Sequence, residues 1–304
     1  MKLVIQIPCY NEEDNIERTI NDLPTKIDGI QEIIILGIDD GSTDKTVEKL
    51  KASGVNHILK LNKNYGLGYA FQAGLDYAKK INADVLVNTD ADNQYQGKYI
   101  IDMVQKLINN KLDIVIGARP ISEIKNFSWL KKKLQKIGSF VVQKISRQKF
   151  SDATSGFRAY SKHAIQKINI SSTFSYTLES LIQANDLNLS IGEVSINVNL
   201  PTRKSRLFKS NIQFIFQQGI IILRCFAIYN PMPSFLILAF PFFFGGFFLM
   251  LRFFINYLSG GGGLIQSLII GAMLIIVSVI LIGLGILGEI IRHNRKIIEK
   301  QKLL

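Results

Sequence analysis

The chain has 304 residues, of which 47% are hydrophobic, and carries a formal net charge of +12 at pH 7. This length suits one large domain or two ordinary ones, and the positive charge indicates anionic partners such as phosphorylated ligands or anionic lipid. Nucleic acid is excluded as the expected partner, because the sequence has no zinc-finger spacing and no RNA-recognition motif, and because two of the three cation clusters (residues 125–149, 203–209 and 292–302) flank apolar blocks.

The first part of the chain alternates short apolar runs with segments of helical character. The runs predicted as strands are residues 3–7, 32–38, 57–61, 85–89 and 114–117. The segments predicted as helices are residues 11–22, with Asn11 as the N-cap, 45–52, 67–80 and 99–109. This alternation predicts an α/β domain with a mostly parallel sheet and helices on both faces.

A polar segment follows each of the first four predicted strands. These segments are residues 8–12, 39–44, 62–68 and 90–94. Ligands of such sheets bind at the carboxyl ends of the strands, so the four segments are expected to meet at one edge. A ligand site explains this repetition better than unrelated turns do. Asp40 and Thr43 have a second interpretation as helix caps, which is compatible with ligand binding.

Asp90 and Asp92 are the sharpest candidate for a site. With one residue between them, both carboxylates can bind one hard divalent cation from the same side, and such a cation is commonly shared with substrate phosphates. The alternative is a polar turn without a ligand. A Walker A motif is absent, and residues 66–68 carry only part of a dinucleotide fingerprint. The sequence therefore favours a nucleotide held by side chains, with Asp39 or Asp40 accepting hydrogen bonds from its base or ribose.

The middle of the chain is basic. Residues 127–149 place lysines between apolar residues at helical spacing, which fits either a helix with a solvated face or a helix on an anionic membrane surface. A helix near 177–185 and a strand near 190–198 follow. Residues 202–229 begin with four cations and are predicted as an amphipathic juxtamembrane helix.

Two apolar blocks, about 234–256 and 264–288, are long enough to form transmembrane helices joined by a glycine-rich turn. Arg252, which follows the uncharged stretch 234–251, is the only charged residue from 234 to 288, whereas the outer flanks are strongly basic, so the soluble domain and the C-terminus are expected in the cytoplasm. The predicted parts are a catalytic domain (1–200), a juxtamembrane helix (201–231), a transmembrane hairpin (232–290) and a basic tail (291–304).

Five motifs, taken in order, resemble those of the family 2 glycosyltransferases with a GT-A (Rossmann-like) fold. With the two apolar blocks they resemble the polyprenyl-phosphate glycosyltransferases, which include dolichyl-phosphate mannose synthase and bacterial undecaprenyl-phosphate glucosyltransferases. The motifs are Pro8-Cys9-Tyr10-Asn11-Glu12, Asp39-Asp40-Gly41-Ser42-Thr43-Asp44, Asn64-Tyr65-Gly66-Leu67-Gly68, Asp90-Ala91-Asp92 and Ser155-Gly156-Phe157-Arg158.

The resemblance implies inverting transfer of one sugar from a UDP- or GDP-sugar donor to a membrane polyprenyl phosphate. It places around the nucleotide Pro8, Tyr10, Glu12, Asp39, Asp40 and Asp90. It implies that Mg²⁺ or Mn²⁺ is held by Asp90, Asp92 and Gln94. It also places Arg119 near the sugar or the phosphates and gives Asp92 a catalytic role. Residues 95–98 depart from the segment that is usual in the family at this point.

The lipid acceptor explains the cations near the predicted membrane segments. A phosphate monoester has a second pKa of about 6 and needs placement more than deprotonation. Arg158, Arg203 and Arg206 are the predicted contacts to the acceptor phosphate, since arginine offers bidentate binding. Asp152 is the candidate base or acceptor-orienting carboxylate, and its alternative role is capping or pairing with Arg158.

Two other functions compete with this one. A processive polysaccharide synthase would carry a Gln-x-x-Arg-Trp motif, which is absent because the only tryptophan, Trp129, lies in another context. A catalytically inactive membrane scaffold does not require acids at Asp90 and Asp92. We therefore expect an integral protein of a bacterial or archaeal membrane that contacts lipid. The sugar, the choice of UDP or GDP and any homo-oligomer stay open.

Overall fold

A computed structural model describes residues 1–120, 143, 148, 150–170, 176–199, 220, 223, 224 and 226–301, without the side chains of 295, 296 and 298–301. The chain divides into two compact units, residues 1–218 and 219–304. Most of the predicted basic helix over 127–149 and the cations at 203–209 lie outside the described residues.

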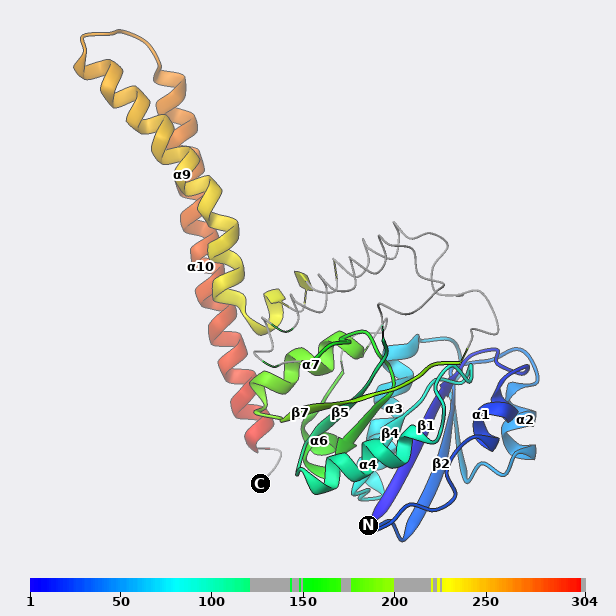
Figure 1. Ribbon diagram of the computed structural model, residues 1–304. Helices are drawn as coiled ribbons and strands as arrows, with labels where there is room; N and C mark the ends of the chain where they lie inside the picture. The colour runs from blue at the N-terminus through cyan, green and yellow to red at the C-terminus, as the bar shows by residue number, and fades with distance from the viewer. Residues whose placement is uncertain are drawn as a thin grey trace. The chain divides into compact units, whose positions relative to one another are not determined.

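The first unit is built on a seven-stranded sheet of order β3-β2-β1-β4-β6-β5-β7 (Figure 1). The strands are β1 (Lys2–Cys9), β2 (Glu32–Asp39), β3 (His57–Lys60), β4 (Val85–Asn88), β5 (Ile114–Ala118), β6 (Arg158–Ser161) and β7 (Ile191–Ser195). Among these described strands, β6 alone runs antiparallel to its neighbours β4 and β5. The predicted α/β class with a mostly parallel sheet is confirmed.

Helices cover both faces of this sheet (Figure 1). They are α1 (Ile16–Asn21), α2 (Thr46–Ala52), α3 (Leu67–Lys80), α4 (Tyr99–Asn109), α6 (Lys162–Lys167) and α7 (Thr177–Asp186). Successive side chains of a strand point to opposite faces. Val85 and Val87 therefore join the main apolar core beside α4, whereas Asn88 points to the other face, toward Tyr176. Because both faces are buried, the central strands read as continuous apolar runs.

The first helix begins later than predicted. Asn11 is not its N-cap, because α1 starts at Ile16 and Asn11 has a left-handed backbone with φ of 54°. Asparagine tolerates this conformation better than most residues do. Its side chain accepts a hydrogen bond from the Thr43 amide, and its own amide donates to the Ser42 hydroxyl. The loop after β1 is thus tied to the loop after β2 instead of continuing as a helix.

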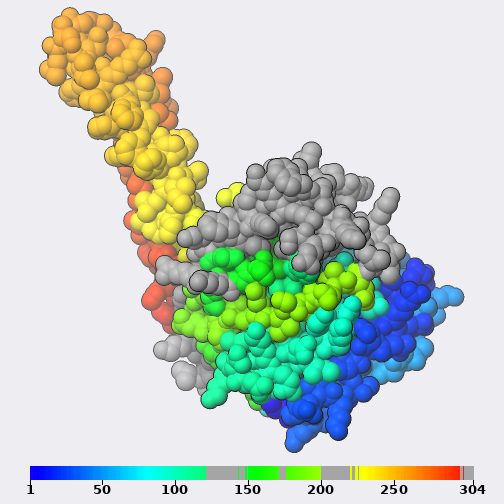
Figure 2. All heavy atoms as spheres, viewed as in Figure 1, coloured from blue at the N-terminus to red at the C-terminus, as the bar shows by residue number. Residues whose placement is uncertain are grey.

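The second unit is a hairpin of two long helices, α9 (Pro231–Leu258) and α10 (Ile265–Gln301), which lie side by side (Figures 1 and 2). Residues 231–258 and 265–294 are long and apolar enough to cross a membrane. The helices approach closely at Gly246, where an added Cβ would lie 2.7 Å from the Gly271 carbonyl oxygen. The predicted two-helix hairpin is confirmed. The predicted tail from 291 continues α10 as far as Gln301.

Candidate functional site

The loops after β1, β2 and β3 meet at the carboxyl edge of the sheet and are tied together by Asp40. The Asp40 carboxylate accepts hydrogen bonds from the backbone amides of Tyr65 (2.8 Å) and Gly66 (2.9 Å), while the Asp40 amide donates to the Cys9 carbonyl. Burial raises the pKa of Asp40, and the two amides oppose this shift. Asp40 therefore anchors the loop after β3.

The capping interpretation is wrong for both Asp40 and Thr43. Asp44 instead lies at the start of α2, where its carboxylate accepts the Thr46 amide at 3.0 Å. The Thr43 amide donates to Asn11, as described above. A cap must lie next to the first helical residue, and α2 begins at Thr46.

Asp39 has one carboxylate oxygen that makes no hydrogen bond to the described residues. The side chain is fully buried at the end of β2, and its Oδ1 accepts the Ser42 amide at 3.0 Å. Its Oδ2 is buried and has no hydrogen-bond partner among the residues that the structure describes. A buried acceptor without a partner is unfavourable, so a ligand N–H or O–H that reached this oxygen would be bound strongly.

The residues predicted from the end of β1 lie at the same edge, next to Asp39. Pro8 is buried within β1, whereas the Tyr10 side chain is 40% exposed. Glu12 is buried, and its amide donates to the Thr46 hydroxyl at 2.8 Å. The structure thus brings together the ends of β1 and β2 that carry the predicted nucleotide-binding residues.

The tight contact at Gly41 carries a testable prediction for stability. Gly41 has a φ of +75°, and an added Cβ would lie 2.5 Å from the Lys63 carbonyl carbon. The left-handed backbone alone disfavours alanine by about 1–2 kcal/mol, so Gly41→Ala should lower the free energy of unfolding by more than this. The matched control is Gly54→Ala, because Gly54 has a φ of +76° and nothing within 4 Å of its added Cβ. Denaturant titration followed by circular dichroism measures both, and equal losses would refute the contact.

Asp90 and Asp92 lie in the loop that follows β4, on either side of the buried Ala91. Burial and the neighbouring Asp92 raise the pKa of Asp90 to about 7, although Arg119 opposes the shift. Burial also raises the pKa of Asp92, whose Oδ1 accepts the Gln94 amide at 3.1 Å. Two buried carboxylates whose proton affinity is raised in this way are also suited to a divalent cation.

The donor set fits a hard cation such as Mg²⁺ or Mn²⁺, since carboxylate and amide oxygens suit these ions. Within the described part of the chain, no group of three or more His, Cys, Asp or Glu side chains is placed to hold a metal. The carboxylates of Asp90 and Asp92 would therefore leave coordination positions to water or to substrate oxygens, as is usual for an ion shared with phosphates.

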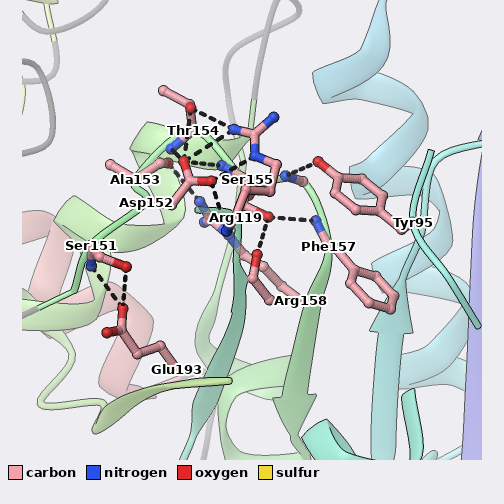
Figure 3. Close-up of polar contacts among 12 residues, drawn as sticks. Tyr95, Arg119, Ser151, Asp152, Ala153, Thr154, Ser155, Phe157, Arg158 and Glu193 are labelled. Carbon is pink, nitrogen blue, oxygen red and sulfur yellow. Dashed lines mark hydrogen bonds and ion pairs between the residues drawn. The ribbon is translucent and has the colours of Figure 1, made fainter. Parts of the chain in front are cut away.

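Arg119 follows β5 directly and is held in place by Asp152 (Figure 3). Its charge is close enough to Asp90 to lower the pKa of that carboxyl. Its Nε donates to Asp152 Oδ2 at 2.6 Å, and its Nη2 donates to Asp152 Oδ1 at 3.0 Å and to the Thr154 hydroxyl at 2.8 Å. The Asp152 carboxylate also accepts the amides of Thr154 and Ser155. Burial alone would raise the pKa of Asp152, but Arg119 and these hydrogen bonds outweigh it and hold the pKa below its usual value. Asp152 thus orients Arg119.

Arg158 does not occupy the predicted place. Its side chain is fully buried, which contradicts a contact with the acceptor phosphate. It does not pair with Asp152, because Asp152 is bonded to Arg119 instead. Its guanidinium donates to oxygens of the surrounding core, namely those of Ser155, Thr177, Ser180 and Ala153. These bonds engage four of the five guanidinium N–H groups and connect the segment before β6 to α7. The other two predicted acceptor contacts, Arg203 and Arg206, lie outside the described residues.

Tyr95 was missed by the sequence analysis. Its ring is buried and stacks on Phe157, with 5.0 Å between the centroids. Burial raises the pKa of Tyr95 to about 12, and its hydroxyl lies within the electrostatic reach of Arg119 and Asp90. The Gly156 amide donates to this hydroxyl at 3.4 Å (Figure 3). The available signal was a tyrosine three residues after Asp92, because a buried tyrosine hydroxyl usually needs a polar partner.

Asn199 also has a place that the sequence did not suggest. Its side chain donates to the Asn93 carbonyl at 2.9 Å and accepts from the Gln96 side chain at 3.0 Å. The backbone amide of Asn199 donates to the Gln94 carbonyl at 2.9 Å. The loop that carries Gln94 is thus fixed by a residue about one hundred positions away, which local spacing does not reveal.

Comparisons with known proteins agree with this geometry. The family described as Glycosyl transferase family 2 matches residues 4–168. An uncharacterized protein of Methanocaldococcus jannaschii is 31% identical over 235 residues, which cover 71% of this chain and 93% of that protein. UDP-N-acetylglucosamine–dolichyl-phosphate N-acetylglucosaminyltransferase of Methanococcus voltae is 33% identical over 212 residues, covering 62% of this chain and 82% of that protein.

Solved structures show the same fold. Glucosyl-3-phosphoglycerate synthase from Mycobacterium tuberculosis, in complex with Mn²⁺, UDP and glucosyl-3-phosphoglycerate, has a TM-score of 0.58 at 16% identity, covering 75% of this chain and 79% of that one. Identity this low speaks for the GT-A-like fold alone. The family match extends over more than half of the chain and includes β1 to β4 with the acids that follow them. The chain therefore belongs to glycosyl transferase family 2 and is a glycosyltransferase.

Proposed function

We propose that the enzyme transfers one sugar from a UDP- or GDP-sugar to the phosphate of a membrane polyprenyl phosphate, with inversion at the anomeric carbon. The observation that carries the proposal is the placement of Asp90 and Asp92 beside the locked Arg119, in a family 2 domain whose chain continues into two apolar helices. Support for the acceptor comes from the names of two relatives, the dolichyl-phosphate N-acetylglucosaminyltransferase of Methanococcus voltae and the polyprenol monophosphomannose synthase of Mycolicibacterium smegmatis.

The donor would bind along the carboxyl edge of the sheet. The free oxygen of Asp39 accepts a hydrogen bond from the base or ribose, and the exposed ring of Tyr10 offers a surface against which the base can pack. Pro8, Glu12 and the loop anchored by Asp40 complete this side of the pocket. Asp90, Asp92 and Gln94 would hold Mg²⁺ or Mn²⁺, which neutralises charge on the departing diphosphate.

In the reaction, an oxygen of the lipid phosphate attacks the anomeric carbon while the bond from that carbon to the diphosphate oxygen breaks. The nucleoside diphosphate leaves with that bonding electron pair. A lipid phosphate is already anionic near pH 7, with a second pKa of about 6, so no strong base is required. Arg119 supplies a fixed positive charge next to Asp90, and Asp152 keeps the guanidinium in place. Such preorganised charge is what stabilises a charged transition state.

The membrane arrangement completes the proposal. α9 and α10 cross the bilayer as a hairpin, with Arg252 near the end of α9 and basic residues before and after the hairpin. By the positive-inside rule, the catalytic part (1–200) and the tail from 291 face the cytoplasm of a bacterial or archaeal cell. Arg203 and Arg206 stay the proposed contacts to the acceptor phosphate, because they precede the hairpin in the chain.

The test is a donor panel with the purified full-length protein in detergent. UDP- and GDP-sugars are offered with a short polyprenyl phosphate and Mn²⁺ or Mg²⁺, and lipid-linked sugar and released nucleoside diphosphate are quantified. We expect one sugar per lipid with one donor class, and loss of product when EDTA removes the cation. Polyprenol without the phosphate is the control acceptor and should give no product. A polymeric product, or none with any donor, would overturn the proposal.

A further inference from the structure

The Asp90 carboxylate rests directly on the backbone of Gly156. An added Cβ at Gly156 would lie 3.2 Å from Asp90 Oδ1 and 3.5 Å from Asp90 Oδ2. The same Cβ would lie 2.7 Å from the Tyr176 hydroxyl oxygen, so the carboxylate and the phenol converge on one side of this glycine. Any side chain at position 156 would push one of them away. The orientation of Asp90 therefore depends on where Gly156 is held.

Gly156 is held by two buried side chains, Asn88 and Tyr176, which we name the bracket. The Tyr176 hydroxyl donates to the Gly156 carbonyl at 2.8 Å, and Asn88 Nδ2 donates to the same carbonyl at 3.0 Å. The two side chains also contact each other, with Asn88 Nδ2 lying 2.7 Å from the Tyr176 hydroxyl oxygen. One carbonyl oxygen thus receives two hydrogen bonds from groups that are themselves linked.

Each member of the bracket is held in place by a further contact. The Asn88 side-chain oxygen accepts a hydrogen bond from Gln6 Nε2 at 2.9 Å, which ties β4 to the centre of the sheet. The Tyr176 ring stacks on Phe71 of α3 with 4.0 Å between centroids and 4° between planes. Asn88 precedes Asp90 by two residues, and both side chains lie at Gly156.

We propose that Asn88 and Tyr176 are positioning residues, which hold Gly156 against the Asp90 carboxylate and so set the direction in which Asp90 faces the donor diphosphate and its cation. This inference rests on the proposed function of Asp90. Each positioning residue acts through Gly156, because a carboxylate that binds an ion must keep its oxygens aimed at it, and partners outside the ligand shell supply that constraint.

The test is Tyr176→Phe, which removes one oxygen atom and leaves the stacked ring. Tyr160→Phe is the matched control, because Tyr160 is also fully buried and also packs on Phe71, with 5.6 Å between centroids. Its hydroxyl lies beside Ser180 and Arg158 instead of Gly156. Both variants of the full-length protein are titrated with Mn²⁺ in the presence of UDP and, in parallel, GDP. Bound Mn²⁺ is followed by electron paramagnetic resonance, and thermal unfolding is recorded.

We expect Tyr176→Phe to weaken Mn²⁺ binding by about 10-fold, the usual size of an outer-shell effect on a metal site, and to lower kcat more than it raises KM for the donor. Tyr160→Phe should keep the Mn²⁺ affinity of the wild type. Gly156→Ala is the second variant, and it should weaken Mn²⁺ binding as well, because its Cβ displaces the carboxylate.

Several outcomes would overturn the inference. Equal losses of Mn²⁺ affinity in Tyr176→Phe and Tyr160→Phe would mean that any lost hydroxyl in this layer disturbs the site. Wild-type affinity in both Tyr176→Phe and Gly156→Ala would refute the bracket while leaving the proposed function intact. If the wild type bound no Mn²⁺ with either nucleotide, the proposed metal site and the bracket would fail together.

Discussion

Asp92→Asn is expected to lower kcat/KM for sugar transfer by roughly two to three orders of magnitude, the size seen when a group that stabilises charge in a transition state is removed. Asp92 and Asp90 are the two carboxylates that follow β4, and burial raises the pKa of each. Asparagine keeps the shape of the side chain and its amide oxygen can still accept the Gln94 amide. The fold should therefore persist while the negative charge offered to the cation is halved.

The measurement combines initial rates of lipid-linked sugar formation with a Mn²⁺ titration. We expect weaker Mn²⁺ binding together with the loss of rate, and partial recovery of rate at high Mn²⁺. Asp14→Asn is the matched control, because Asp14 is an exposed acid on the same edge, in the loop after β1. Should Asp92→Asn transfer sugar as fast as Asp14→Asn, the assignment of the metal site would be wrong.

Asp152→Ala is expected to lower the free energy of unfolding by about 3–5 kcal/mol, as found when one partner of a buried ion pair is removed. The Asp152 side chain is fully buried and the Arg119 side chain is 11% exposed, and two hydrogen bonds of 2.6 and 3.0 Å join them. Without the carboxylate, the Arg119 charge stays in a poorly solvated place with only Thr154 as a side-chain acceptor that the structure describes. Denaturant titration of the detergent-solubilised protein measures this loss.

A double variant separates charge burial from catalysis. Replacing a whole buried pair by apolar residues is often nearly neutral for stability, so Arg119→Met with Asp152→Leu should recover most of the stability lost in Asp152→Ala. The double variant should not recover sugar transfer, because it lacks the positive charge of Arg119 beside Asp90. Restored transfer in the double variant would contradict the role given to Arg119.

The pH dependence of stability gives an independent check on the pair. Arg119 holds the folded pKa of Asp152 below its usual value, although burial opposes it, so the pair stabilises the protein above the unfolded pKa of about 3.9 and loses this effect as the pH falls further. Asp152→Ala should lack that contribution. Its stability should therefore fall less steeply than that of the wild type when the pH drops below about 4.

The sequence by itself determined the class of the fold and the edge at which the site lies. Strands buried on both faces must be apolar, and helices between them must be amphipathic, so β–α alternation is visible without any tertiary contact. The acids at Asp39 and Asp90 follow apolar runs directly, so their place at strand ends is a local fact. The two apolar helices are likewise visible because their length and composition are local properties.

The tertiary structure alone decided which polar groups meet. Spacing suggested Arg158 as the partner of Asp152, but the partner is Arg119, 33 residues away, at the end of the neighbouring strand β5. Likewise Asp40 binds the loop after β3, and Asn88 and Tyr176, 88 residues apart, meet over Gly156. The physical reason is that a buried charge or hydroxyl must find its partner in space. That partner depends on strand order and on which helix covers which face of the sheet. Neither can be inferred from the spacing of residues along the chain.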